Sequence, residues 1–232
     1  NLKLMRDRGI QLDGLEQEAT KLADEGKTSM YVAIEGKAAG IVAVADTVKE
    51  DSKAAIQALK NMGLEVVMIT GDNERTAKAI ARQVGIERVM AEILPQDKAF
   101  HVQKLQLEGK KVAMVGDGIN DAPALAQADI GMAIGTGTDV ALEASDITLI
   151  KGSLKGVVLA IQISRATMRN VYQNLFGAFI YNALGIPIAL GVLYPFFKML
   201  LSPLMAAAAM SFSSVTVITN ANRLKRWKPK GG

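Results

Sequence analysis

A short apolar run, Val112 to Val115, ends in Gly116-Asp117-Gly118, and a second aspartate, Asp121, follows four residues after the first. This pattern predicts a buried parallel strand and then a helix that begins near Asn120. Open α/β sheets bind ligands at the carboxyl ends of their strands, so Asp117 and Asp121 are expected to face one crevice. Two hard oxygen ligands there suit Mg²⁺ and a phosphate, although Asp and Gly are also ordinary turn residues.

Strands and helices alternate along most of the chain. Residues 1–26 read as helical pieces that end near Gly26, and 29–34 with 40–45 read as an antiparallel hairpin. The alternation that follows predicts a parallel sheet with helices on both faces. Its expected elements are helices over 50–62, 74–84, 98–107, from 120, and over 138–143, and strands over 64–69, 89–91, 112–115, 130–134 and 147–150.

Two more polar sites accompany this strand pattern. Thr70 and Gly71 follow one strand and offer a hydroxyl and a backbone N–H to an anion, and Lys98 begins a helix with a point charge. Together with Asp117 they predict a crevice for phosphoryl transfer. Each has a plainer explanation alone, because the Thr70 segment could be a turn and helix cap, and a single lysine is usually solvated.

The last third of the chain is strongly apolar. Residues 151–170 are amphipathic and carry Arg165 and Arg169, and 171–194 and 199–218 are two uncharged runs. Each run is long enough to cross a bilayer, and the flanking basic residues place both outer ends on the cytoplasmic side. The sequence therefore predicts a membrane hairpin, with a buried pair of soluble helices as the alternative.

Composition narrows the possible partners. Half of the residues are hydrophobic, the mean hydropathy is +0.20, and there is no Cys, which excludes disulfides and thiolate metal sites in this chain. The net charge of +4 comes from a basic tail with five positive charges, which leaves a body close to neutral. A basic nucleic-acid-binding surface is therefore not expected.

Several of these segments together resemble the phosphorylation-domain motifs of P-type ATPases. The segments are Thr70-Gly71-Asp72-Asn73, 94–98, 116–125, 128–135 and 144–146. The resemblance covers nearly the whole chain and is closest to the heavy-metal transporters. Within that group, Tyr181-Asn182 and Met210 to Ser214 resemble the copper(I) exporters.

The resemblance implies a fold with three parts. These are an α/β haloacid-dehalogenase-like phosphorylation domain over 46–152, the end of an α+β nucleotide-binding domain over 1–45, and a transmembrane two-helix hairpin over 153–222. A basic cytoplasmic tail over 223–232 follows. The chain starts at Asn1 without Met or a signal-peptide pattern, so we expect it to begin partway through a domain.

The resemblance also implies roles for single residues. Asp117 and Asp121 would bind Mg²⁺, while Asn1 and Asp46 would belong to the ATP site. Phosphate contacts would come from Thr70, Gly71 and Lys98, with Asp72 and Asn120 nearby.

The membrane hairpin carries a second candidate site. Polar side chains inside membrane spans are functional candidates, and Met210 and Ser214 are four residues apart on one helix face. A thioether is a soft donor suited to Cu(I), and the resemblance implies Tyr181, Asn182, Met210 and Ser214 as copper ligands or ligand-orienting groups. The alternative is close helix packing, in which Ser and Ala are contact residues and Met210 fills space.

Three family motifs are absent from this chain. It has no Asp-Lys-Thr-Gly acceptor motif, no Thr-Gly-Glu motif and no Cys-Pro-Cys. We therefore expect a C-terminal fragment or one chain of a divided protein, which alone would not form the aspartyl phosphate. Because the acceptor strand normally lies at the centre of the sheet, we also expect the sheet to be incomplete.

The functional hypothesis is one part of an ATP-driven copper(I) export pump. Its partners would be the rest of the ATPase with its acceptor Asp, actuator domain and other transmembrane helices, the lipid bilayer and a copper chaperone, with no nucleic acid. The expected location is the bacterial plasma (inner) membrane, as a multi-pass protein whose catalytic domain and C-terminus are cytoplasmic. The alternatives are a Zn/Cd-type heavy-metal ATPase and a membrane-tethered phosphatase of the haloacid dehalogenase type.

Overall fold

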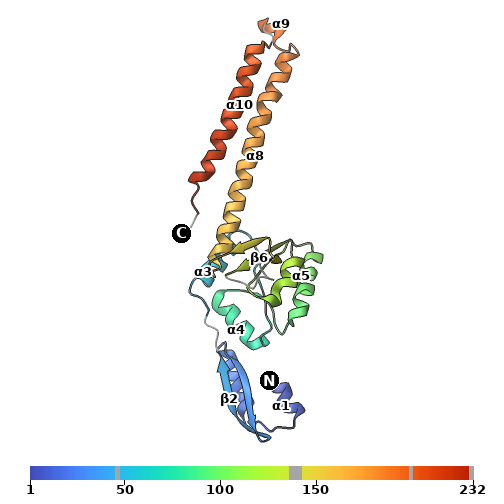
Figure 1. The fold of residues 1–232 in the computed structure, drawn as a ribbon, viewed down its shortest axis with the longest axis vertical. Coiled ribbons are helices and arrows are strands. Elements are labelled where there is room, and N and C mark those ends of the chain that lie inside the picture. The colour runs from blue at the N-terminus through green and yellow to red at the C-terminus, as the bar shows by residue number, and fades with distance from the viewer. Residues whose placement is uncertain (45–47, 136–142, 199–200, 230–232) are drawn as a thin grey trace. The chain divides into compact units, whose positions relative to one another are not determined.

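The computed structural model describes residues 1–44, 48–135, 143–198 and 201–229. The chain divides into two compact units, Asn1–Val158 and Leu159–Gly232 (Figure 1).

The first unit begins with helices and a hairpin. Helices α1 (Leu2–Asp7) and α2 (Leu15–Asp24) precede β1 (Thr28–Ile34) and β2 (Lys37–Val44), which pair antiparallel as predicted. The turn between the strands consists of Glu35 and Gly36, with φ of 53° and 79°. Positive φ at both central residues is the requirement of the type I′ turn, which matches the twist of the two strands.

Two strand–helix pairs follow. The elements are α3 (Ser52–Asn61), β3 (Val67–Ile69), α4 (Glu74–Val84), β4 (Arg88–Met90), a short 3₁₀ turn η1 (Pro95–Asp97) and α5 (Lys98–Leu107). Helix α4 has the predicted bounds, because Asn73 caps it by accepting the Thr76 N–H at 3.0 Å and Gly85 ends it with φ of 81°. Strands β3 and β4 pair in parallel.

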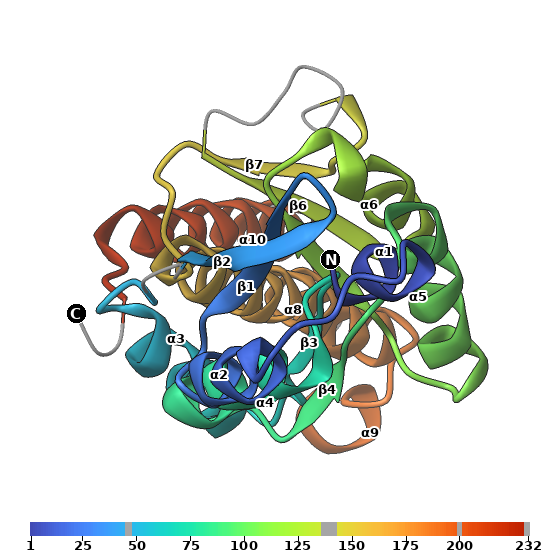
Figure 2. The ribbon, with the colours of Figure 1, turned by 90° about the horizontal axis from the view of Figure 1, so that it is seen from below.

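The central strand–turn–helix segment is also confirmed. Strand β5 (Ala113–Gly116) leads into η2 (Ile119–Asp121) and α6 (Ala122–Gln127), followed by β6 (Ile130–Ile134) and β7 (Ile147–Leu149). Strands β5, β6 and β7 form a parallel three-stranded sheet with β6 in the middle (Figure 2). The expected helix over 138–143 falls almost wholly outside the described residues.

The parallel pairing is confirmed, and the sheet is incomplete, as expected for a chain without the acceptor motif. In the part that the structure describes, β3 pairs only with β4, and β5 pairs only with β6, so the strands form two separate parallel sheets. Strands β3 and β5 therefore each have an edge without a partner strand. Alternation of strands and helices predicts parallel pairing, but it does not specify which strands are neighbours.

The core of this unit lies where α5 and α6 pack together and α6 covers β5 and β6. Val102 of α5, Ala124 and Leu125 of α6 and Ala133 of β6 have at most 1% of their surface exposed. Burial of side chains of this size is the main favourable term in folding. This packing holds the turn after β5 in place.

One carboxylate fixes the start of this sheet. Asp129, just before β6, accepts hydrogen bonds from Lys111 Nζ at 2.7 Å, the Val112 N–H at 3.0 Å and Gln106 Nε2 at 3.1 Å. The Lys111 bond first, and then the other two, hold the pKa of the Asp129 carboxyl well below its usual range. Asp129 thus links α5, the start of β5 and the start of β6.

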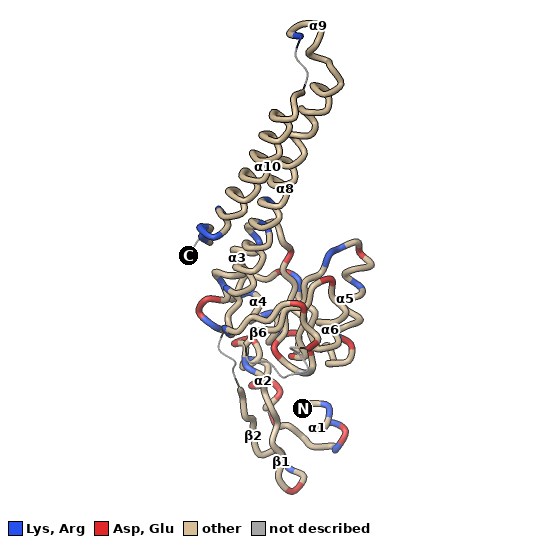
Figure 3. The backbone as a smooth tube through the Cα atoms, turned by 45° about the horizontal axis from the view of Figure 1, so that its top comes forward, with Lys and Arg blue, Asp and Glu red and all other residues tan. Residues whose placement is uncertain are grey.

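The second unit is a helical hairpin. Helix α8 (Lys155–Ala189), most of which lies in this unit, is followed by α9 (Tyr194–Phe197), α10 (Pro203–Arg223) and the short turn η3 (Leu224–Arg226). Helices α8 and α10 lie side by side (Figure 1). Between Arg169 and Arg223 the sequence has one charge, Lys198, and most of the hairpin is free of charged residues in Figure 3.

Composition supports one of the two predicted membrane spans. Among the described residues, a single helix is long and apolar enough to cross a bilayer, Pro203–Arg226, with a mean hydropathy of 1.4 and an apolar stretch with no buried part. The other predicted span, 171–194, does not meet this criterion, and its helix ends at Ala189 rather than Tyr194. That α8 crosses a membrane remains a prediction.

Candidate phosphoryl-transfer site

A cavity of about 270 Å³ lies at the carboxyl ends of β3 and β5. Ile69 ends β3 and Gly116 ends β5, and both residues line it, so the cavity lies where parallel strands commonly bind ligands. The other lining residues come from the rest of β5 and the turn and η2 after it, from the end of β6, from the chain before α3 and its first residue, from the first residue of α5, and from the segment after β7. Its lining consists of Lys49, Ser52, Ile69, Lys98, Met114, Val115, Gly116, Asp117, Asp121, Ile134, Gly152 and Leu154.

An ion pair closes one side of this cavity. Lys98 Nζ lies 2.6 Å from Asp121 Oδ1, and the two side chains are only 17% and 11% exposed. The second oxygen of Asp121 accepts the Asp117 N–H at 3.3 Å. Because both side chains are largely shielded from water, removing either one would leave the charge of the other buried and uncompensated. The structure therefore brings together Lys98, Asp117 and Asp121 as the sequence predicts.

Gly116 makes this arrangement possible. A Cβ atom at this position would lie 2.6 Å from Asp121 Cβ and 2.8 Å from Asp121 Oδ2. Carbon atoms in contact are normally about 3.5–4.0 Å apart, so no residue with a Cβ fits unless Asp121 moves. In the structure, Asp121 thus occupies the space beside Gly116 that a Cβ atom would fill.

The Thr70 turn is closed by hydrogen bonds of its own, and its contact with a phosphate stays a prediction. Thr70 Oγ1 donates to Asp72 Oδ2 at 2.8 Å and accepts the Asp72 N–H at 3.1 Å, so its hydroxyl is engaged within its own turn. A Cβ on Gly71 would lie 3.3 Å from the Ile93 carbonyl oxygen, which makes that position tight. Ile69 lines the cavity, but Thr70, Gly71 and Asp72 are not part of its lining. Asn73 provides the helix cap that the plainer explanation expected.

The two aspartates fit a magnesium ion only as part of a larger ligand set. The described residues contain no group of three or more His, Cys, Asp or Glu side chains placed to bind a metal. Mg²⁺ usually keeps several waters and takes one or two carboxylates together with phosphate oxygens. Asp117 is exposed and lines the cavity, and Asp121 lies next to it, so this donor set fits such an ion.

The sequence argument missed several residues around the cavity. Lys49, just before α3, donates to the Gly152 carbonyl, and Ser153 donates to Asp51, so two segments far apart in sequence are joined at the cavity wall. Lys49 gives the site a second cation beside Lys98. A lysine between Asp46 and a helix was a weak signal, because single lysines are usually solvated.

Two further predicted residues, Asn1 and Asn120, do not line this cavity. Asn120 is exposed in the turn after β5. Asn1 caps α1 by accepting the Leu4 N–H at 2.9 Å, and Asp46 lies outside the described residues. An ATP site therefore stays a prediction.

The polar residues of the helical hairpin lie on both helices. Tyr181 Oη on α8 is 3.2 Å from Thr216 Oγ1 on α10, a contact that the sequence argument did not include. Ser214 Oγ donates to the Met210 carbonyl one turn earlier, and the Met210 side chain is 70% exposed. Asn182 reaches only the Ala178 carbonyl of its own helix, at 3.5 Å. In the described residues, no hydrogen bond joins Tyr181 or Asn182 to Met210 or Ser214.

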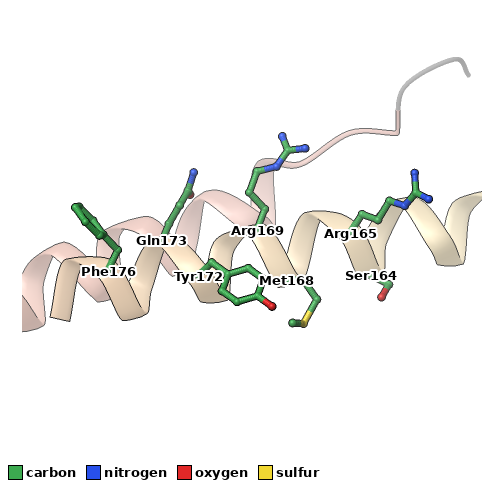
Figure 4. A pocket seen from close by; sticks show the side chains of 7 residues that line it. All are labelled: Ser164, Arg165, Met168, Arg169, Tyr172, Gln173 and Phe176. Atoms are coloured by element: carbon green, nitrogen blue, oxygen red, sulfur yellow. The ribbon is translucent and has the colours of Figure 1, made fainter. Parts of the chain in front are cut away.

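A second hollow, of about 640 Å³, lies along the amphipathic part of α8. Its lining includes Arg165 and Arg169, which extend from the same side of the helix, while Met168 points to the other side (Figure 4). Tyr172 and Phe176 continue the apolar part of the lining. Basic and aromatic residues in this order are typical of a helix that enters a membrane interface.

Comparison with known proteins shows the family to which the chain is related. The sequence profile of the haloacid dehalogenase-like hydrolases matches residues 1–129, and a second profile of the same description matches residues 99–161. The "Probable copper-transporting ATPase PacS" of Synechococcus elongatus is 58% identical over 222 residues, which is 96% of this chain and 30% of that protein. The copper-exporting P-type ATPase of Bacillus subtilis is 56% identical and is covered over 27% of its length.

A solved structure has the same fold. A zinc-transporting PIB-type ATPase in its E2·Pi state matches 92% of this chain with a TM-score of 0.74 and 37% identity. The match covers 34% of that protein, so the chain spans about a third or less of its relatives. The chain belongs to the haloacid dehalogenase-like hydrolases, and over nearly its whole length it corresponds to one part of the metal-transporting P-type ATPases.

Proposed function

We propose that this chain is one part of an ATP-driven copper(I) export pump that works through an aspartyl phosphate, with the acceptor aspartate outside the chain. The observation that carries the proposal is the cavity at the ends of β3 and β5, where Lys98, Asp117 and Asp121 meet. A cation and two carboxylates at parallel strand ends are suited to phosphoryl transfer.

Each of these residues has a distinct role in the proposed reaction. Asp117 and Asp121 would bind Mg²⁺, which supplies positive charge against the phosphate oxygens when bound. Lys98 is held at the cavity by its ion pair with Asp121, so its ammonium group is already in position to bind a phosphate oxygen. Lys49 lines the same cavity and would add a second positive charge. The nucleotide would reach the site through the part that includes Asn1 and Asp46.

The rest of the ATPase polypeptide is the proposed partner. The unpaired edges of β3 and β5 border the cavity, and a parallel strand between them would join the two sheets and bring its own carboxyl end to Lys98 and Asp117. We propose that the acceptor strand occupies this place. The β1–β2 hairpin also supports a partner. Five of its apolar side chains are exposed, and an exposed apolar patch of this kind commonly marks a contact with another protein segment. These residues are Met30, Val32, Ile34, Val42 and Val44.

Copper(I) is the proposed transported ion. Met210 supplies a soft thioether on α10, and no Asp or Glu occurs between Arg169 and the end of the chain. Tyr181, Asn182 and Ser214 would complete or orient the ligand set. Zn²⁺ is the second candidate, because a zinc-transporting ATPase is among the similar structures. We propose that α8 and α10 both cross the bacterial plasma membrane and that the basic tail is cytoplasmic.

Ion-stimulated ATP hydrolysis by the complete protein tests this proposal. Cu(I) is expected to stimulate hydrolysis and Zn²⁺ is not, and Met210→Ala should lower the stimulation by Cu(I). Phosphorylation by inorganic phosphate should survive in Met210→Ala, because that residue is remote in sequence from the Asp117 site. Stimulation by Zn²⁺ but not by Cu(I) would reject the copper assignment, and the absence of any phosphoenzyme would reject the pump.

A further inference from the structure

Three asparagine side chains join α8 and α10 in a closed set of hydrogen bonds. Asn170 Nδ2 on α8 donates to the backbone carbonyl of Asn220 on α10 at 2.8 Å, and the side-chain Nδ2 of Asn220 donates to Asn174 Oδ1 on α8 at 2.8 Å. Asn174 Nδ2 completes the set by donating to Asn170 Oδ1 at 3.0 Å. All three residues are partly buried, and we refer to them as the amide clamp.

Most of the hydroxyl groups on α10 bond within their own helix. Ser211, Ser214 and Thr216 each donate to a carbonyl one turn earlier in α10 itself. One further polar contact crosses the helix pair, between Tyr181 and Thr216. Within the described residues, the amide clamp therefore supplies most of the polar bonding that depends on the alignment of α10 against α8.

The remaining surface of the pair is compatible with sliding. Between Asn174 and Asn220 the two helices carry many Ala, Gly, Leu and Phe residues, whose contacts are non-directional and so specify the alignment less strictly than hydrogen bonds do over a one-turn slide of about 5.4 Å. Hydrogen bonds between specific amides change completely in such a slide. Unpaired amides are costly in an apolar environment, so bonds of this kind select one alignment.

We propose that Asn170, Asn174 and Asn220 are positioning residues that set the alignment of α10 against α8. At a rise of 1.5 Å per residue, Met210 lies about 15 Å along α10 from Asn220, and Tyr181 lies about 16 Å along α8 from Asn170. The clamp therefore brings Met210 and Tyr181 to the same level of the hairpin. Their role as ion ligands rests on the proposed function, but the alignment itself does not.

Disulfide trapping in membranes tests the alignment in the complete protein. A Cβ on Gly177 would lie 3.6 Å from Thr216 Cγ2, so Gly177→Cys with Thr216→Cys reports the native alignment. Gly177→Cys with Phe212→Cys reports a one-turn slide. This chain has no Cys, so a cross-linked peptide pair from the two helices identifies the introduced cysteines by mass spectrometry.

The measured quantity is the ratio of native to shifted cross-link. We expect Asn174→Leu and Asn220→Leu each to lower it about threefold, the effect of one hydrogen bond between membrane helices. The double variant should lower it no further, because both changes break the same bond. Asn170→Leu breaks the separate bond to the Asn220 carbonyl and is expected to lower the ratio independently. Asn220→Gln keeps a side-chain amide, so its ratio of native to shifted cross-link should lie closer to that of the unmodified protein than the ratio of Asn220→Leu does.

Asn222→Leu is the matched control. Asn222 lies two residues beyond Asn220 on α10, is exposed, and has no side-chain hydrogen bond in the described structure. It should leave the ratio unchanged. An unchanged ratio in the Asn170, Asn174 and Asn220 variants would overturn the clamp. If Asn222→Leu lowers the cross-link ratio as much as the three clamp variants do, the clamp is also overturned, because a general effect of leucine would then explain the result.

A second measurement separates this inference from the proposed function. In the clamp variants, KM for Cu(I) is expected to rise several-fold more than kcat falls, because the ligands are misaligned while the phosphorylation site is intact. If the unmodified protein shows no Cu(I)-stimulated hydrolysis, the proposed function fails and the cross-link ratio still decides the clamp. If hydrolysis is normal and the ratio does not respond, the clamp alone fails.

Discussion

Substituting Gly116 by Ala should distort the candidate site through one added methyl group. The new Cβ would lie 2.6 Å from Asp121 Cβ and 2.9 Å from Asp121 Cγ, roughly 1 Å closer than carbon atoms normally approach. Asp121 lies in a tightly packed segment beside Ala122, Ala124 and Leu125, which are buried, so it cannot move freely. A shift of about 1 Å would weaken both its bond to Lys98 and its bond to the Asp117 N–H.

Two magnitudes follow from this geometry. Adding a methyl group to a packed site typically costs about 1–3 kcal/mol of folding free energy. A misplacement of about 1 Å at a reacting centre can lower a rate about 100-fold. We therefore expect Gly116→Ala to destabilise β5 and α6 by about 1–3 kcal/mol and to slow Mg²⁺-dependent phosphorylation from ATP in the complete protein by about two orders of magnitude.

Hydrogen exchange of the β5 and α6 amides measures the first effect. A loss of about 1–3 kcal/mol corresponds to roughly 5- to 150-fold faster exchange in these elements. Gly118→Ala is the matched control for stability, because a Cβ at that position meets no atom within 4 Å. It should change exchange by less than about threefold. Equal protection in the two variants would refute the argument that Gly116 is required by the position of Asp121.

Three further changes test other parts of the chain. In the complete protein, Asp117→Asn should abolish Mg²⁺-dependent phosphorylation and leave the fold largely intact, and normal phosphoenzyme levels would contradict the metal role. Thr76, 1% exposed, donates to the Lys27 carbonyl at 3.2 Å and accepts from Asn73 Nδ2, so Thr76→Val should lower the free energy of unfolding by about 1–3 kcal/mol, as measured by denaturant titration. Because the folded-state pKa of Asp129 is depressed, its contribution to stability is present above its ordinary pKa of about 4 and is lost as the pH falls through the folded value. Acid unfolding should therefore be less steep in Asp129→Asn, and an identical pH profile would argue against this contribution.

Local sequence patterns predicted most elements of the fold. The bounds of α4 follow from a capping Asn73 and a terminal Gly85, and the hairpin follows from the Glu35-Gly36 turn. These signals act within a few residues of each other, so they are visible without the tertiary structure. The end of α8 at Ala189 also has a local signal, which the prediction did not use. Gly191 follows with φ of 80°, and the Gly191 and Val192 N–H groups bond back to the Ile188 and Pro187 carbonyls.

The candidate site was predicted in part. Lys98, Asp117 and Asp121 follow strand ends or begin helices, and the parallel fold places such positions together. Thr70 had the same signal, yet its hydroxyl is bonded to Asp72 within the turn. Local hydrogen bonding competes with ligand binding at such positions, and the sequence does not say which prevails.

The sequence by itself determined the alternation of strands and helices, the apolar character of the hairpin and the identity of the residues at the strand ends. Those properties depend on periodicity, turn chemistry and composition, all of which are local. Only the tertiary structure decided that β3 and β5 do not pair, that the space at Gly116 is taken by Asp121, and that Asn170, Asn174 and Asn220 meet. The strand pairing and the asparagine contacts between α8 and α10 join residues far apart in sequence, which leave no local pattern. The position of Asp121 at Gly116 depends on the conformation of the turn after β5, which the types of its residues do not specify.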